Sequence, residues 1–342
     1  MLLTTSGTTG LPKLAVMPHA TMVRTTAALR EYFAQPEETN VLVATPMALS
    51  SALTPNAFLA LGSGWTLHLF HPNTPPPILH ACVRSAPIHL LNTVPAFLRI
   101  FLRYWNGKPF PAMRRVSFGG EVMPWSSVET IQAMFPKALV NINYGVTEAG
   151  NRVSNLDTRD PRARAGGVGK PLSHFDVRVT QLEGSSAGEL RLKGPTVFLG
   201  YLQADGSYRG LDEEGFLHTG DLVSFDSDGG MVYRGRRDGL VKVGGRFVNV
   251  QAVSDVLRSL PGVADAACWA TPHALAGHTL TAQVIPGPGV TLDVSALRDA
   301  LATRLPSWEI PGELSVRDEI TETSAGKRPV VRAAEDPQRA GP

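Results

Sequence analysis

Residues 5–13, TSGTTGLPK, combine four hydroxyl side chains, two glycines and one lysine within nine positions. Glycines leave backbone N–H groups accessible, and these groups, the hydroxyls and an ammonium group can all donate to phosphate oxygens. The composition predicts a loop that wraps the polyphosphate of a nucleotide. Glycine and threonine also mark ordinary turns, so the rest of the chain has to support this prediction.

The loop differs from a P-loop, which requires GxxxxGK followed by Ser or Thr. Lys13 follows Pro12, and the two GK pairs at residues 169–170 and 326–327 lack a glycine five positions upstream. A P-loop NTPase is therefore disfavoured.

Five further motifs follow the loop in a fixed order. They are YGVTE at 144–148, GEL at 188–190 leading to GY at 200–201, TGD at 219–221, GRRD at 235–238 and GK at 326–327. Together with the loop, this series resembles the signature of the adenylate-forming superfamily, which includes acyl-CoA synthetases, luciferases and the adenylation domains of peptide synthetases. The resemblance extends over residues 5–327, nearly the whole chain.

The hydrophobic pattern predicts an α/β fold. Apolar runs at 41–44 and 88–91 alternate with helical patterns at 95–104 and 125–135, as expected for a buried parallel sheet. Residues 177–236 contain short strand patterns and a hairpin signal at Asp228-Gly229, which indicates a β-rich subdomain. Residues 240–305 predict paired strands followed by two helices, a small α+β domain.

These patterns divide the chain into residues 1–176, 177–237 and 238–342. The resemblance implies that the first two parts form an incomplete large adenylation domain and the third a small mobile C-terminal domain. It also implies that Asp238 is the hinge between an adenylation pose and a thiolation pose. Glycines flank this segment and absorb large changes in φ and ψ at low cost, although a static turn would have the same composition.

Composition excludes several classes of partner. The 342 residues are 43% hydrophobic with a net charge of +2, and no basic run suggests nucleic acid or a membrane surface. Residues 1–3 lead directly into the loop, no leader pattern or membrane-spanning apolar stretch is present, and the two cysteines are far apart. We expect a cytoplasmic protein whose partners are small molecules or proteins, and histidines 68, 71, 80 and 89 show no metal-ligand spacing.

The resemblance assigns roles to individual residues. ATP phosphates would be bound by Thr5, Ser6, Gly7, Thr8, Thr9, Gly10 and Lys13. Adenine would lie between the segment Gly119, Gly120, Glu121 and the ring of Tyr144, which is followed by Gly145. Thr147 would contact the α-phosphate, Glu148 would hold Mg²⁺, and Asp221 with Arg236 would bind the ribose. Lys327 would act in the adenylation step.

The second half-reaction implied by the resemblance passes the acyl group to a thiol of coenzyme A or carrier-protein phosphopantetheine. Residues 243–246 resemble the segment that lines the pantetheine tunnel. Other members of the superfamily use amines or oxygen, so the acceptor stays open.

Three departures from the family pattern affect the interpretation. The phosphate loop begins at residue 5, whereas relatives carry a whole subdomain before it. A start codon assigned too late, a natural split with the first half on another polypeptide, or a truncated relic would each explain this, and we favour the late start codon.

Residues 46–51, PMALSS, contain neither the His common in relatives nor the Asp that pairs with an α-amine. An α-amino acid is therefore disfavoured, and Leu49, Phe58 and Phe118 suggest an apolar aryl or alkyl acid. Val250 and Ala252 occupy positions where many relatives have Pro and Glu.

The sequence therefore predicts a ligase of metabolic or natural-product acids that forms an acyl-adenylate with ATP and Mg²⁺ and then transfers the acyl group. Two rivals remain. One is a non-catalytic nucleotide-binding fragment, and the other is a subunit of a split ligase that requires a partner chain.

Overall fold

A computed structural model describes residues 1–5, 13–35, 38–71, 73–121, 123–182, 187–244, 246–273 and 277–320. The chain folds into two compact units. The first contains Met1–Thr180, Leu190–Thr219 and Ser224–Tyr233, and the second contains Gln181–Glu189, Gly220–Val223 and Arg234–Pro342. Each unit is described by itself below, and the division at residues 176 and 237 stays a prediction.

A six-stranded sheet forms the centre of the first unit. Its order is β4-β3-β5-β6-β7-β8, with neighbours parallel except for β8, which runs antiparallel to β7. The bounds are β3 Asn40–Val43, β4 Thr66–Leu69, β5 Leu90–Thr93, β6 Arg115–Gly119, β7 Leu139–Tyr144 and β8 Ser154–Asp157. The predicted α/β fold with a parallel sheet is confirmed.

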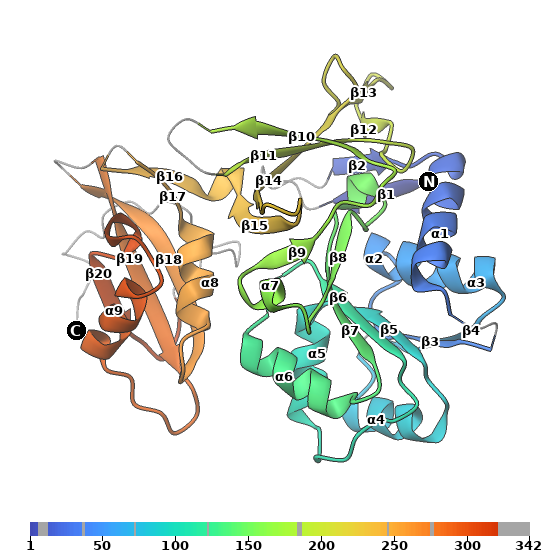
Figure 1. The fold of residues 1–342 in the computed structure, drawn as a ribbon, viewed down its shortest axis with the longest axis horizontal. Coiled ribbons are helices and arrows are strands. Elements are labelled where there is room, and N and C mark those ends of the chain that lie inside the picture. Colours follow the sequence, from blue (N-terminus) through green and yellow to red (C-terminus); the bar gives the residue numbers. More distant parts are fainter. Residues whose placement is uncertain are drawn as a thin grey trace. The chain divides into compact units, whose positions relative to one another are not determined.

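Helices cover both faces of this sheet (Figure 1). One face is covered by α4 Pro76–Ser85, α5 Pro95–Arg103 and α6 Trp125–Met134, and the other by α1 His19–Phe33 and the helical stretch of α2 Ser50–Ala52, η1 Leu53–Phe58 and α3 Leu59–Ser63. Prolines occupy the first turn of α4 and α5, where the missing N–H has no intrahelical partner to lose. Pro55 lies inside the second stretch, which adopts a π-helical turn there.

Two apolar clusters fill the spaces between the sheet and its helices. The larger one contains Val116 and Phe118 of β6 packed with Phe101 and Phe135 from the α4 to α6 side. The smaller one, on the α1 side, contains Leu29, Phe33, Val41, Leu59 and Leu90.

A second sheet in the same unit holds the ends of the predicted phosphate loop. Its order is β1 Leu2–Thr5, β2 Lys13–Val16, β12 Gly200–Leu202 and β13 Tyr208–Arg209. Thr5 pairs with Lys13 in the antiparallel β1–β2 register, and Tyr201 pairs with Ala15. The loop thus begins and ends on adjacent strands.

The β-rich segment forms a five-stranded sheet whose residues are shared between the two units. Its order is β10 Asp176–Gln181, β11 Gly188–Lys193, β14 Leu217–Phe225, β15 Met231–Arg236 and β9 Gly167–Gly169, and the short helix α7 Pro161–Arg164 precedes β9. The predicted hairpin turn lies between β14 and β15, where Gly229 has a φ of 78° and the Asp226 N–H donates to the Gly230 carbonyl at 2.9 Å. Only glycine adopts such a φ without strain.

The second unit contains the small α+β fold expected after residue 238. The hairpin of β16 Leu240–Val243 and β17 Arg246–Asn249 leads into α8 Val250–Arg258. A three-stranded sheet of β18 Val263–His273, β19 Gly277–Pro286 and β20 Glu313–Val316 packs with α8 and α9 Val294–Ala302 around one apolar core, and a short turn, η4 Ser307–Glu309, precedes β20.

Asn249 caps the first helix of this unit. Its Oδ1 accepts from the N–H groups of Gln251 and Ala252, while its Nδ2 donates to the carbonyl of Arg236 at 2.9 Å. A Cβ added to Gly235 would lie 2.2 Å from Asn249 Nδ2, so this glycine is needed for the close approach.

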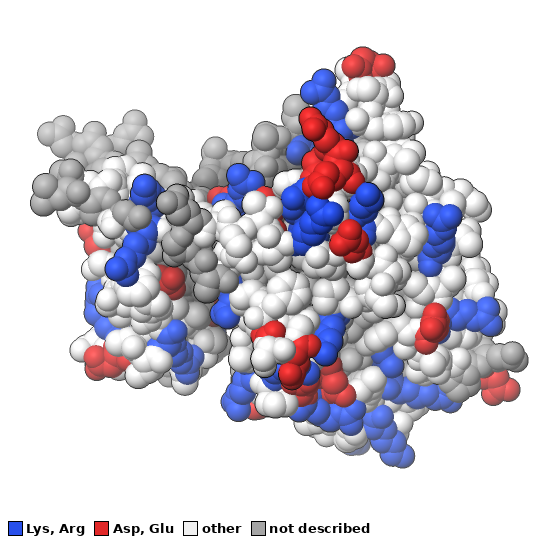
Figure 2. Space-filling model, turned by 45° about the horizontal axis from the view of Figure 1, so that its top comes forward, with Lys and Arg blue, Asp and Glu red and all other residues white. Residues whose placement is uncertain are grey.

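Charged side chains of both signs are interspersed on the face shown in Figure 2. In the first unit, Arg178 and Arg191 form ion pairs with Asp212 and Glu214. None of the described helices is long and apolar enough to cross a bilayer.

Each of the histidines at 68, 71, 80 and 89 makes a hydrogen bond within the described residues, and His71 Nδ1 accepts from the Asn73 N–H at 3.2 Å. His68 Nε2 lies 2.8 Å from Asn40 Oδ1, His80 Nε2 lies 2.8 Å from the Phe101 carbonyl, and His89 Nδ1 accepts from the Asn40 N–H. Within the described ranges, no group of three His, Cys, Asp or Glu side chains is arranged to hold a metal.

Candidate active site

The YGVTE motif lies at the carboxyl end of β7, where the chain makes a tight turn. Thr147–Ala149 form a 3₁₀ turn, η2, and the Asn151 N–H donates to the Val146 carbonyl at 3.0 Å. A Cβ on Gly145 would lie 2.4 Å from the main chain of Asn151, so only glycine fits there. This turn places Thr147 and Glu148 at the edge of the parallel sheet where ligands bind in open α/β folds.

Glu148 and Lys13 meet at the same aromatic side chain. The Tyr201 hydroxyl donates to Glu148 Oε1 at 2.5 Å, and Lys13 Nζ lies 5.0 Å from the centre of the Tyr201 ring. The Phe198 N–H donates to the Glu148 carbonyl at 2.8 Å. The structure therefore brings together the carboxylate that the sequence analysis expects to hold Mg²⁺ and the cation that it expects to bind ATP phosphates.

Tyr201 received no role from the sequence, although it belongs to the GY pair of the family signature. The signal that identifies it is its register position, because Tyr201 pairs with Ala15 on the strand that carries Lys13. That pairing joins residues about two hundred positions apart and is visible only in the fold.

The side chain of Thr147 contacts Ser50, which belongs to segment 46–51, the segment that differs from the family pattern. Thr147 Oγ1 lies 2.8 Å from Ser50 Oγ, and Ser50 Oγ also donates to Asn151 Oδ1 at 2.9 Å. Ser50 begins α2 and is buried. The segment that lacks the family His thus supplies a hydroxyl to the same turn.

The predicted adenine segment follows β6. A Cβ on Gly119 would lie 2.0 Å from the Asn143 carbonyl oxygen, and Gly120 has a φ of 92° in open space, so both positions suit glycine. Glu121 forms an ion pair with Arg99 at 2.9 Å. Tyr144 is buried, with its ring 6.1 Å from that of Tyr233.

In the second unit, one arginine joins two of the predicted residues. Arg236 Nη1 donates to Asp221 Oδ1 at 3.1 Å, and its Nε donates to Asp238 Oδ1 at 3.3 Å. Asp221 is buried. The sequence analysis expected Arg236 beside Asp221, and the structure places the two side chains in contact.

Glu189, from the GEL motif, is a further acid beside this group. Its Oε1 accepts from the Gly220 N–H at 3.2 Å and its Oε2 accepts from Arg237 at 2.8 Å. Motif spacing offered no role for it. It holds the main chain that leads into Asp221.

Seven predicted site residues lie outside the described ranges. These are Ser6, Gly7, Thr8, Thr9 and Gly10 of the phosphate loop, Lys327, and the second glycine of residues 243–246. Their proposed roles stay predictions.

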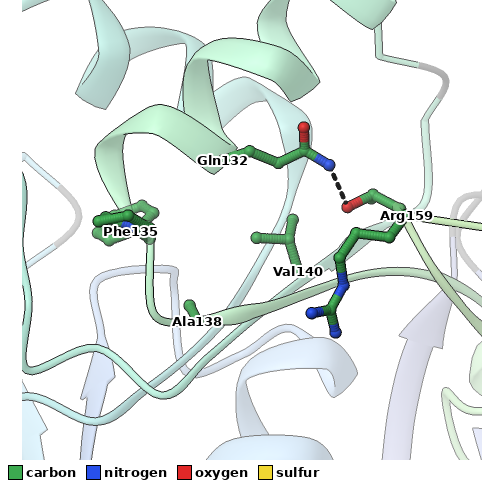
Figure 3. Close-up of a pocket in the computed structure, with 7 residues that line it drawn as sticks. Gln132, Phe135, Ala138, Val140 and Arg159 are labelled. Carbon is green, nitrogen blue, oxygen red and sulfur yellow. Dashed lines mark hydrogen bonds between the residues drawn. The ribbon is translucent and has the colours of Figure 1, made fainter.

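A pocket of about 240 Å³ in the first unit is separate from the predicted residues (Figure 3). It is lined by Gln132, Phe135, Pro136, Ala138, Val140, Thr158 and Arg159, and Gln132 Nε2 donates to Thr158 Oγ1 at 2.9 Å. Val140 lies near the amino end of β7, opposite to the end that carries Thr147 and Glu148. We assign no ligand to this pocket.

Comparisons with known proteins agree with the motif series. Residues 1–202 match the AMP-binding enzyme family, and residues 252–327 match the AMP-binding enzyme C-terminal domain. The p-hydroxybenzoic acid–AMP ligase FadD22 of Mycobacterium tuberculosis is 30% identical over 96% of this chain and 47% of its own length. The feruloyl-CoA synthase of an Amycolatopsis species is 26% identical over 96% of this chain and 67% of its own length.

Solved structures show the same fold. ATP-bound MatB from Rhodopseudomonas palustris has a TM-score of 0.82 at 26% identity, covering 96% of this chain and 66% of MatB. The o-succinylbenzoate CoA synthetase MenE from Bacillus subtilis, in complex with its acyl-adenylate intermediate, has a TM-score of 0.82 at 25% identity, covering 96% and 67%. The chain spans about half to two thirds of the length of these relatives.

Proposed function

Because the chain belongs to the AMP-binding enzyme family of the adenylate-forming superfamily, we propose that it activates a carboxylic acid with ATP. The acid would form an acyl-AMP with release of pyrophosphate, and the acyl group would then pass to a thiol. Relatives are named as an acid–AMP ligase and a CoA synthase, and they are longer than this chain. The activity of this chain is therefore a proposal.

The contact of Glu148, Tyr201 and Lys13 carries the proposal. Attack of a carboxylate on an α-phosphate brings two anions together, so the site must supply positive charge and fix the oxygens in line. Lys13 supplies one such charge, and Tyr201 holds Glu148 in the orientation seen in the structure. Thr147, held by Ser50, offers a hydroxyl beside them.

The residues present fit a magnesium ion. Mg²⁺ in phosphate sites takes one or two carboxylates together with phosphate oxygens and water. Glu148 Oε1 accepts from Tyr201, and no described residue donates to its second oxygen. Glu148 would hold the ion through that oxygen, and a bound ion would neutralise phosphate charge.

The remaining residues would complete nucleotide binding. The segment Gly119, Gly120, Glu121 and the ring of Tyr144 would hold adenine. Asp221 would accept from the ribose hydroxyls in the orientation that Arg236 gives it. Lys327 would approach the acid and the α-phosphate during adenylation only.

The acceptor in the second step is proposed from the names of relatives. One relative is named as a feruloyl-CoA synthase and another as a long-chain-fatty-acid–CoA ligase. A carrier-protein phosphopantetheine presents the same thiol. If no thiol compound discharges the bound adenylate, the transfer step is wrong while adenylation stands.

Acid-dependent exchange of pyrophosphate into ATP tests the first step. We expect exchange with at least one acid from a panel of aryl and alkyl acids in the presence of Mg²⁺. Glu148→Gln removes the charge at the proposed metal ligand and should lower exchange about a hundredfold or more. The matched control is Glu129→Gln. Glu129 is an exposed acid on α6 that forms an ion pair with Arg164 at 3.6 Å, and its replacement should leave exchange unchanged.

The outcome also decides between the rivals. A folded chain that binds ATP but exchanges with no acid would support a nucleotide-binding fragment or a subunit that requires a partner. Exchange by the purified monomer would exclude the partner-dependent alternative.

A further inference from the structure

The α1 side of the six-stranded sheet carries polar side chains in register across four strands. Asn92 pairs with Ser117, Ser117 with Asn141, and Asn141 with Asp157. One step nearer the carboxyl edge, Gly119 pairs with Asn143 and Asn143 with Asn155. Successive residues of a strand point to opposite faces, so these positions share the face that Leu90 presents to α1.

Arg152 lies buried over this polar row. Its Nη1 donates to Asn155 Oδ1 at 2.6 Å and its Nη2 to Asn92 Oδ1 at 3.4 Å, and its guanidinium is 5.5 Å from the Phe33 ring. The residue is 3% exposed. Its Nε has no hydrogen-bond partner, and among the described residues no carboxylate contributes to the shift of its pKa. Burial lowers the pKa of Arg152 to about 10, so it stays charged at neutral pH.

Further buried polar atoms around Arg152 also lack partners. They are Asn56 Oδ1, Ser117 Oγ, Asn151 Nδ2 and Asn155 Nδ2. Asn151 precedes Arg152 and is held by Ser50, which contacts Thr147. The group therefore adjoins the turn that the proposed reaction uses.

A buried cation without a counter-charge is costly, and a neutral partner leaves most of that cost in place. An anionic group of a ligand would offset it and would accept from the unpaired Nε. We propose that Arg152, with Asn155, binds a second carboxylate of the acid, so that the chain prefers dicarboxylic acids. This inference rests on the proposed adenylation at Thr147 and Glu148, which acts on the first carboxylate.

The structure removes one of the three residues, Leu49, Phe58 and Phe118, that suggested an apolar acid. Phe118 lies in the apolar cluster on the α4 to α6 side, because it alternates with Ser117 along β6. It is therefore on the opposite face from Arg152. An aryl or alkyl chain between two carboxylates remains compatible with the site.

Arg115 provides an internal comparison. It is also buried on the α1 side, with Nη1 3.3 Å from Asn141 Oδ1 and its guanidinium 5.0 Å from the Phe33 ring. Its Nε also lacks a hydrogen-bond partner, so the two arginines differ in the charges around them and not in this atom. It begins β6, further from the carboxyl edge. Burial raises the pKa of Asp157, but hydrogen bonds from Arg159 and the charges of Arg159 and Arg115 lower it overall. Arg115 thus has a carboxylate in its field, whereas Arg152 depends on a ligand.

The test compares matched acids in pyrophosphate exchange and in calorimetric binding. The pairs are terephthalate with 4-methylbenzoate and adipate with hexanoate. We expect the wild type to favour one dicarboxylate over its partner by about a hundredfold, and Arg152→Met to abolish that ratio. Arg152→Lys should restore part of it, and Arg115→Met should leave it unchanged.

The outcomes separate the two proposals. Equal or better use of the monocarboxylates by the wild type would overturn the inference while leaving adenylation intact. An equal loss of preference in Arg115→Met would overturn it too, because the effect would then be structural. Arg152-dependent binding of a dicarboxylate without exchange would support the inference and contradict the proposed function. If Arg152→Met does not fold, the test uses Arg152→Gln instead, together with the wild-type ratio of dicarboxylate to monocarboxylate use. A wild-type ratio near one would still overturn the inference.

Discussion

The two faces of the six-stranded sheet use alternate residues of the same strands for different purposes. Toward α4, α5 and α6, the sheet presents Val116, Phe118 and Val140 to an aromatic cluster. Toward α1 it presents Asn92, Ser117 and Asn141 beneath two buried arginines. Parallel strands covered by helices on both faces are usually apolar throughout. The polar row on the α1 side departs from this pattern, which agrees with its proposed role in binding the acid.

The largest effect should come from breaking the apolar face. Phe101 is 1% exposed and packs against Phe97, Phe135 and His80. Phe101→Ala should lower the free energy of unfolding by about 3–5 kcal/mol, because it leaves a cavity in a close-packed cluster. Urea denaturation measures this loss. The preference between matched acids should not change, and a changed preference would contradict the separation of the two faces.

A smaller loss of stability should distinguish Ser154 from Ser117, two buried serines on opposite faces of the six-stranded sheet. Ser154 alternates with Asn155 along β8, and its Oγ donates to the Val168 carbonyl at 2.7 Å, whereas Ser117 Oγ has no partner. Ser154→Ala should cost about 1 kcal/mol of stability, and Ser117→Ala should be neutral or stabilising. Chemical denaturation of the two variants side by side provides the comparison. Equal losses would mean that the Ser117 hydroxyl is satisfied in solution.

The smallest effect should be a pH dependence that arises on the apolar face. Burial lowers the pKa of His80, the Phe101 carbonyl opposes this, and the Arg84 charge adds to it. The pKa of His80 in the folded state lies below the unfolded value of 6.5. As pH falls below 6.5, the unfolded chain therefore binds more protons than the folded chain does. Stability is then complete above pH 6.5 and declines below it.

Unfolding measured at pH 7.5 and pH 5.5 should show this decline, and His80→Gln should reduce it. The buried His89 also has a pKa lowered by burial, so part of the decline should remain in the variant. An unchanged pH dependence in His80→Gln would show that this histidine is not the source.

The sequence predicted those parts of the fold that depend on local pattern. The strands near residues 41–44 and 88–91 and the helices near 95–104 and 125–135 were found because apolar runs and helical periods are continuous there. Helix α1 was not predicted, because buried Thr21 and Thr25 interrupt its apolar face. Phe118 suggested an apolar acid from composition alone, but strand alternation places it in the apolar cluster on the α4 to α6 side.

The site was predictable only where a motif brought residues together in sequence. Thr147 and Glu148 follow this rule, as do Arg236 and Asp238. Tyr201, Ser50 and Arg152 act through contacts between segments that are 50 to 100 positions apart, such as the bonds of Tyr201 to Glu148, of Ser50 to Thr147 and of Arg152 to Asn92. No spacing rule encodes such pairs, so they became visible only in the folded structure.

The cap of α8 has a consequence for exchanging C-terminal domains between relatives. Asn249 binds its own helix and the carbonyl of Arg236 at once, and it leaves no room for a side chain at position 235. A recombination junction between residues 236 and 249 would take the glycine from one parent and the asparagine from the other. Functional chimaeras should therefore keep residues 235–249 as one inherited block, with the crossover placed before Gly235.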